Sequence, residues 1–214
     1  MKFCAIHIQT GGTNHKEHSL LEFAAIVEDT NNPLSYEKIP RYNVIVKQNV
    51  YHGDPYALYY NREIFNQLQL PEDKRQKKAI PVEALAQNFQ SWLVKHINTK
   101  VKNTQGIEVS GALNADGVSS QFFSHTISVS AAGKNFANFQ LDFIKRIPHI
   151  DEFIQFNHRF LDPSILFWDP KSDEVLPSSE ECKRRAGLEN IEKHNESLLE
   201  CWDIIQLFRK SLNY

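Results

Sequence analysis

Three runs of β-favouring apolar residues stand near the start of the chain, each ended by polar turn residues. They cover residues 2–8, 20–27 and 42–46, and the second run is interrupted only by Glu22. The turns between them, at 10–14 and 29–33, are rich in Gly, Asn, Thr and Pro. Strands joined by short turns are typical of an antiparallel meander. This part of the chain therefore predicts three antiparallel strands.

Apolar positions at helical spacing dominate the rest of the chain. The periodicity predicts helices over 61–69, from Pro81 to about His96, over 136–147, and from about Glu196 to Lys210. Residues 72–78 are charged and predict a loop or a helix end, whereas 122–130 alternates as a strand does. Strands followed by a mixture of strands and helices predict a mixed α/β fold, with helices packed on a sheet.

Two shorter helices are predicted from their start signals. Asp162 followed by Pro163 is expected to open a short helix over the following residues. Ser178 stands before a serine and two acidic residues, and Gly187 marks the end of that second helix.

Length and composition narrow the class of protein. The 214 residues predict a single domain, 1–214, with a glycine-containing polar excursion around 98–121. The formal net charge is −2, so any binding of nucleic acid has to rest on a local patch. Three widely spaced cysteines without a CxxC predict reduced thiols and a cytoplasmic protein. The first residues do not fit the pattern of a signal peptide, and no apolar run reaches about 18 residues, so no membrane partner is expected.

Three segments together resemble a known family. They are residues 6–12 with 20–25, residues 133–143, and residues 195–202. In order and spacing they are similar to the DEDDh 3′–5′ exonucleases, which include the polymerase proofreading subunits and the oligoribonucleases. The resemblance spans residues 3–209. It implies a ribonuclease H-like fold, in which a mixed sheet is flanked by helices.

The catalytic motifs of that family are altered in this sequence. Its first motif, Asp-x-Glu, is replaced by His7 and Gln9, and the aspartate of its second motif is replaced by Gln140. Its third motif, a histidine followed five residues later by an aspartate, aligns with Asn195 and Glu200. Glu200 is therefore the only carboxylate retained at the four acidic positions.

A second register for the third motif takes His194 as its histidine, but Leu199 then falls at the carboxylate. We prefer the Asn195 and Glu200 register, because Cys201 and Trp202 then follow the acid as the family pattern expects.

These replacements predict the loss of the family's chemistry. Phosphodiester hydrolysis by two metal ions needs several carboxylates to hold two dications about 4 Å apart. The family offers four carboxylates, whereas this chain offers Glu200 alone, and the Asn195 amide is unable to act as a general base. No metal cofactor is therefore expected; Mg²⁺ or Mn²⁺ is implied only if activity is retained.

Basic residues beside the expected cleft are candidates for contacts with phosphates. Lys134 and Asn135 belong to the second motif segment, and Lys183, Arg184 and Arg185 form a short basic cluster. The alternative for the cluster is a solvated helix face, which is the commoner outcome for a short charge run.

Two further features allow two interpretations each. Tyr56, Tyr59 and Tyr60 could stack on bases or pack at the edge of the sheet. Glu22 is either an acceptor near the site or an exposed residue at a sheet edge.

The sequence thus predicts a degenerate 3′–5′ exonuclease homologue that is inactive and retains at most weak binding of single-stranded nucleic acid. Two alternatives stay open: a functional but unorthodox 3′–5′ exonuclease, and a protein–protein interaction module on the same fold. The resemblance also implies a possible homodimer, since dimers occur in the family.

Overall fold

The computed structural model describes residues 1–97, 101–102, 108–109, 126–188 and 196–214. Most of the predicted excursion around 98–121 lies outside these residues, as does Asn195. The described parts of the excursion are strands β5 (Val101–Lys102) and β6 (Glu108–Val109), which pair in antiparallel fashion.

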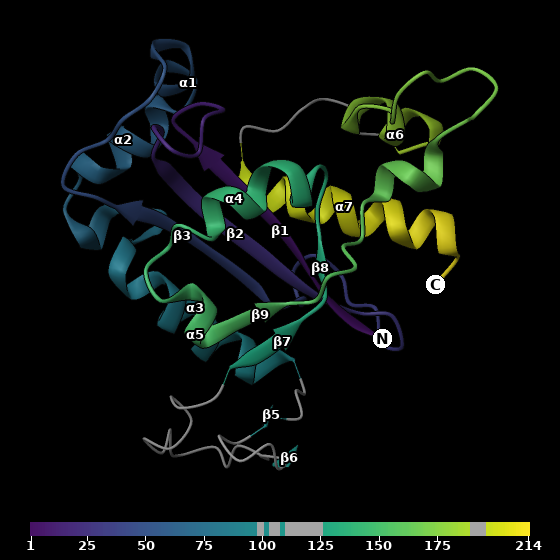
Figure 1. Cartoon of the computed structure of the whole chain (residues 1–214), viewed down its shortest axis with the longest axis horizontal. Coiled ribbons are helices and arrows are strands. Elements are labelled where there is room, and N and C mark those ends of the chain that lie inside the picture. The colour runs from purple at the N-terminus through teal and green to yellow at the C-terminus, as the bar shows by residue number, and fades with distance from the viewer. Residues whose placement is uncertain (98–100, 103–107, 110–125, 189–195) are drawn as a thin grey trace.

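A five-stranded mixed sheet forms the centre of the structure (Figure 1). Its first three strands are β1 (Lys2–Thr10), β2 (Leu20–Asp29) and β3 (Arg41–Lys47), and they form the predicted antiparallel meander. Strand β8 (Ala131–Ala132) adds in parallel beside β1, and β4 (Lys78–Pro81) adds in parallel beside β3. The charged pattern of 72–78 did not predict β4, because only two apolar residues stand in that strand.

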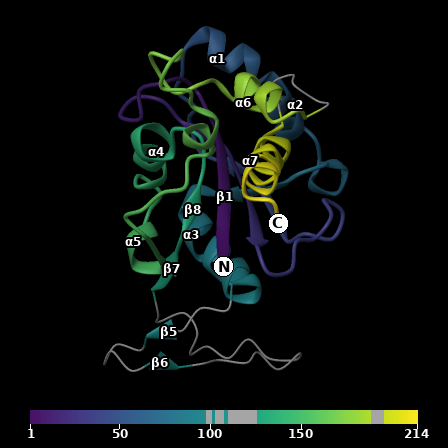
Figure 2. The same cartoon turned by 90° about the vertical axis from the view of Figure 1, so that its right-hand side faces the viewer.

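The period-two alternation of β1 divides the core into two layers. Cys4, Ile6 and Ile8 face the larger layer, which includes α3 (Val82–His96), α4 (Leu141–Ile144) and α5 (Ile150–Phe153). Phe3 and Ala5 face the other layer, which is dominated by α7 (Ser197–Leu212). The two views show helices on both sides of β1 (Figure 2).

The same alternation decides where His7 and Gln9 point. His7 and Gln9 continue the series begun by Phe3 and Ala5, so both side chains lie on the sheet face that α7 covers. Since Glu200 lies on α7, strand pleating brings the first and third motif segments to the same side of the sheet.

The predicted helix over 136–147 has two parts. A π-helical turn, η3 (Phe136–Gln140), is followed by α4, and Asn135 begins the turn in the left-handed conformation with a φ of 52°. The predicted strand over 122–130 contains β7 (Ile127–Val129), while residues 122–125 lie outside the described part; β8 follows as a separate strand beyond the predicted range. Strand β9 (Ile154–Phe156) pairs with β7, and neither β9 nor α5 was predicted.

The start signals of the shorter helices are confirmed. Asp162 caps the 3₁₀ helix η4 (Pro163–Phe167), and Ser178 caps α6 (Ser179–Arg185) through its hydroxyl. Among the described residues, the other helices are α1 (Pro55–Tyr60), α2 (Arg62–Gln69) and the 3₁₀ turn η1 (Glu72–Lys74). Of the helices in the described residues, none combines the length and the apolar character needed to cross a membrane.

Candidate functional site

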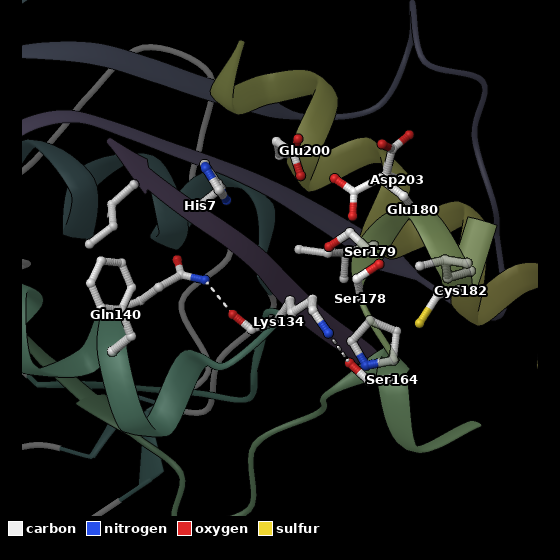
Figure 3. Close-up of a pocket in the computed structure, with 15 residues that line it drawn as sticks. His7, Lys134, Gln140, Ser164, Ser178, Ser179, Glu180, Cys182, Glu200 and Asp203 are labelled. Carbon is white, nitrogen blue, oxygen red and sulfur yellow. Dashed lines mark hydrogen bonds between the residues drawn. The ribbon is translucent and has the colours of Figure 1, made fainter. Parts of the chain in front are cut away.

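A cavity of about 270 Å³ lies between β1, η3, η4, α6 and α7 (Figure 3). Strand β1 contributes His7, η3 contributes Gln140, and α7 contributes Glu200 and Asp203. Three of the five motif positions named from the sequence therefore meet at one cavity, although His7 and Gln140 are more than 130 residues apart in the chain.

The other two motif positions are not seen in this cavity. Gln9 is half-buried and lies opposite Glu22 in the β1–β2 register, outside the cavity lining. Glu22 is buried, and its carboxylate accepts hydrogen bonds from the Lys77 ammonium at 3.0 and 3.1 Å. This pairing excludes the exposed-edge interpretation of Glu22. Asn195 lies outside the described residues.

Gln140 is held in a fixed orientation at the floor of the cavity. Its side chain is 3% exposed, and its Nε2 donates to the backbone carbonyl of Lys134 at 3.0 Å. Its Oε1 is buried and has no hydrogen-bond partner among the described residues. The amide thus supplies one neutral oxygen where the family pattern has a carboxylate.

Lys134 lies in the wall of the cavity, and its ammonium group is bonded to neighbouring protein atoms. Its Nζ donates to Ser164 Oγ at 2.9 Å and to the carbonyl of Pro177. Asn135 is exposed, and its backbone N–H donates to Asp162 Oδ2 at 2.9 Å. Of these two candidate phosphate contacts, only Lys134 lines the cavity.

The basic cluster on α6 does not form a single exposed patch, which corrects the sequence-based picture. Lys183 has no exposed surface, and its Nζ lies 2.8 Å from Asp203 Oδ2. Arg184 and Arg185 are exposed on the other side of the helix, and both bond Glu181. The cluster is divided because α6 packs one face against η4 and α7, and position 183 falls on that face.

Arg185 also joins α6 to the loop that precedes it. Its guanidinium bonds both carboxylate oxygens of Asp173 and the carbonyl of Phe167 at 2.7 Å. These bonds hold the pKa of Asp173 at about 2. Bonds from Arg184 and Arg185 hold the pKa of Glu181 at about 2 as well. Both arginines are therefore engaged with carboxylates of this chain.

The stability that these ion pairs of Arg184 and Arg185 confer should depend on pH. Both carboxyl pKa values lie below those of an unfolded chain, about 3.9 and 4.3, so the stabilisation is present above about pH 4.3 and is lost as the pH falls towards about 2. Replacing Arg185 with alanine is expected to lower the thermal midpoint at pH 6, with a gap from wild type that narrows below about pH 4. Calorimetry across this pH range measures the difference in thermal midpoint between the two proteins. A difference that stays constant with pH would contradict a stabilising role for these ion pairs.

Asp203 is the residue of the cavity that sequence reasoning missed. It lies one turn after Glu200, on the buried stripe of α7, where its neighbours Ile204 and Leu207 also line the cavity. An acidic residue among the apolar positions of this helix, three residues after Glu200, was the available signal.

The donors at this cavity do not fit a pair of Mg²⁺ ions. His7 offers nitrogen, Gln140 offers one neutral amide oxygen, and the Asp203 carboxylate is paired with the buried Lys183. Glu180 of α6 adds a carboxylate to the lining, but it does not stand at a motif position. Glu200 alone supplies a carboxylate at the motif positions, whereas Mg²⁺ favours several charged oxygen ligands. Within the described residues, no three His, Cys, Asp or Glu side chains are grouped so as to hold a metal ion.

The cysteine at this cavity does not have the properties of a nucleophile either. Cys182 lines the cavity, but burial raises the pKa of its thiol, and this effect exceeds the lowering caused by Lys134. The sulfur is therefore in the protonated, unreactive form near neutral pH.

No protein-family model matches the sequence, and a search of curated proteins finds no relative. Solved structures do match. The crystal structure of E. coli exonuclease I in complex with a dT13 oligonucleotide superposes with a TM-score of 0.57 at 13% identity, over 99% of this chain and 42% of that one. The zinc-bound form of the E. coli exonuclease I–ssDNA complex gives 0.56 at 14% identity, over 97% and 40% of the two chains.

A second nuclease has a similar architecture. The crystal structure of cell-death related nuclease 4 (CRN-4) has a TM-score of 0.56 at 12% identity, over 99% of this chain and 64% of that chain. The chain thus spans about two fifths of exonuclease I and somewhat less than two thirds of CRN-4. At these identities the likeness concerns architecture alone, and that architecture is the mixed α/β, ribonuclease H-like fold of the exonucleases.

Proposed function

We propose that this chain is a degenerate 3′–5′ exonuclease homologue that does not hydrolyse phosphodiester bonds and that retains weak binding of single-stranded nucleic acid. One observation carries the proposal: His7, Gln140 and Glu200 meet at one cavity, and only Glu200 is an acid. Three positions that match the family's motifs line this cavity, and two of them lack the charge that two-metal chemistry requires.

The chemistry of the replacements supports the loss of the catalytic acids as a set, and not a single substitution at one position. Gln9 and Gln140 keep the size and hydrogen bonding of an acid without its charge. In the absence of metal, clustered carboxylates would repel one another at this buried site, and neutral amides remove that cost. The amide of Gln140 is in addition hydrogen-bonded to the backbone of Lys134.

Retained binding is supported by the fold and limited by the charge. The similar exonuclease I structures hold single-stranded oligonucleotides. On this chain Lys134 is the basic side chain among the cavity-lining residues, and the arginines of α6 are paired with carboxylates. Since phosphate neutralisation provides most of non-specific affinity, the small number of available cations predicts weak, salt-sensitive binding.

A nuclease assay tests the catalytic half of this proposal. Purified protein is incubated with 5′-labelled single-stranded DNA and RNA in EDTA, Mg²⁺ or Mn²⁺, and products are resolved on a denaturing gel. We expect no metal-dependent shortening. A matched variant restores the family residues, with His7→Asp, Gln9→Glu, Gln140→Asp, Glu200→Asp and Asn195→His.

The restored variant shows what the natural chain lacks. Its metal-dependent shortening of the same oligonucleotides from the 3′ end would show that the missing acids are the cause of inactivity. Shortening by the natural chain that requires Mg²⁺ or Mn²⁺ would instead support the functional, unorthodox exonuclease.

A further inference from the structure

Helix α1 presents an unusual aromatic surface. None of its residues is buried, and the side chains of Tyr56 and Tyr59 are 79% and 68% exposed. Tyr60 stacks against Tyr56 with ring centroids 6.4 Å apart and planes 21° apart. The structure therefore rejects packing at the sheet edge for Tyr56 and Tyr59, one of the two interpretations that the sequence left open.

A cation accompanies these rings. The guanidinium of Arg62, at the start of α2, lies 4.8 Å from the ring centroid of Tyr59 and donates to the Tyr59 carbonyl at 3.3 Å. Two acidic residues lie nearby: Asp54 is 3.7 Å from His18, and Glu63 accepts hydrogen bonds from neutral amides of α2, which leave its charge in place. The surface thus combines exposed aromatic faces with a positive charge.

The aromatic surface is anchored on a rigid base. The N–H of Asp54 donates to the carbonyl of Gly11 at 2.7 Å, and Asn61 Nδ2 donates to the carbonyl of Thr10 at 3.3 Å. Gly11 and Gly53 approach so closely that a Cβ on Gly11 would lie 2.3 Å from the carbonyl oxygen of His52. These contacts fix α1 against the end of β1, so the tyrosines need little ordering when they bind a partner.

The position of α1 relates it to the candidate site. Figure 2 shows β1 running between α4 and α7, with α1 above the end of this strand. His7 lies three residues before the end of β1, and it lines the cavity. The aromatic surface and the cavity therefore both lie near the same end of β1.

From this chemistry we infer that Tyr56, Tyr59 and Arg62 form a stacking surface for the bases of single-stranded nucleic acid. Tyrosine offers a flat face to any base, and such stacking tolerates sequence variation, while arginine meets the phosphate backbone. The inference deepens the proposed function and rests on its binding half. It adds contacts with the bases to the few phosphate contacts that the cavity offers.

Fluorescence anisotropy with 5′-labelled dT10 and rU10, in EDTA and at low salt, tests the surface. Alanine substitution of one stacked aromatic residue typically costs about 5- to 150-fold in affinity. Replacing Tyr56 and Tyr59 together with alanine is therefore expected to weaken binding at least 10-fold. The matched variant with both residues changed to phenylalanine keeps the rings and should bind like wild type. Since neither side chain is buried, circular dichroism should be unchanged in both variants.

An abasic oligonucleotide of the same length separates stacking from phosphate binding, and it should bind wild-type protein as weakly as dT10 binds the alanine variant. Equal binding of dT10 by the alanine variant and wild type would overturn the stacking surface while leaving the proposed function intact. Failure of wild type to bind any oligonucleotide would overturn both the surface and the binding half of the proposed function. The nuclease assay judges the catalytic half independently.

Discussion

Replacing Lys183 with alanine is expected to lower the free energy of unfolding by about 3–5 kcal/mol, as happens when one partner of a buried ion pair is removed. The Lys183 side chain has no exposed surface, and its Nζ lies 2.8 Å from Asp203 Oδ2. The truncation leaves the Asp203 carboxylate, itself largely buried, without its closest cation and opens a gap between α6 and α7. Urea unfolding followed by circular dichroism measures the loss.

Two control variants separate the ion pair from helix propensity and from packing. Arg184 is exposed on the same helix, so Arg184→Ala should change stability by less than about 0.5 kcal/mol. The double variant Lys183→Met with Asp203→Leu removes both charges and keeps apolar volume, so it should recover much of the loss. A loss below about 1 kcal/mol for Lys183→Ala would mean that the pair does not anchor α6 on α7.

The ion pair between Lys183 and Asp203 also illustrates what could not be predicted from the sequence. Sequence reasoning predicted strands β1 to β3, the helix starts near Asp162 and Ser178, and helix α7, because each depends on residues that are neighbours in sequence. Lys183 and Asp203 lie 20 positions apart on separate helices, and their pairing depends on how those helices pack. A run of three basic residues therefore suggested one surface, whereas tertiary packing divided it between core and solvent.

Strand β4 and helix α1 were not predicted because their sequences carry little local signal. Strand β4 contains few apolar residues and is stabilised by pairing with β3, a partner far away in sequence. Helix α1 was missed because it buries nothing, so it carries no amphipathic pattern. Its exposure became visible only in the structure, and it is the exposure of Tyr56 and Tyr59 that turns an ambiguous aromatic stretch into a candidate binding surface.

Buried carboxylates outside the altered motifs are neutralised by side chains of this chain. Lys77 lies 3.0 Å from Glu22, Arg209 lies 2.7 Å from Glu28, and Lys183 pairs with Asp203. Even with the bidentate Arg209, burial raises the pKa of Glu28, which shows how strongly these sites disfavour an unpaired charge. The same cost would apply to acids at positions 7 and 140, which line one cavity with Glu200, and the natural chain has His7 and Gln140 there.

Restoring that cluster should therefore make folding depend on metal. The variant with His7→Asp, Gln9→Glu, Gln140→Asp and Glu200→Asp is expected to melt well below wild type in EDTA, because its carboxylates are crowded together. Mg²⁺ or Mn²⁺ at 100 times its dissociation constant would stabilise the variant by about 2.7 kcal/mol, or about 5–10 °C for a chain of this size. The natural chain should show the same thermal midpoint in EDTA and in millimolar Mg²⁺.

A matched variant distinguishes crowding from added charge. Asn31→Asp, Gln69→Glu and Gln87→Glu add the same three negative charges at exposed positions, so this variant should melt near wild type and gain little from Mg²⁺. A clear rise in the midpoint of the natural chain with Mg²⁺ or Mn²⁺, absent from a Glu200→Gln variant, would mean that Glu200 still holds a metal ion. The missing carboxylates would then no longer account for inactivity, and the functional but unorthodox exonuclease would become the better explanation of the site.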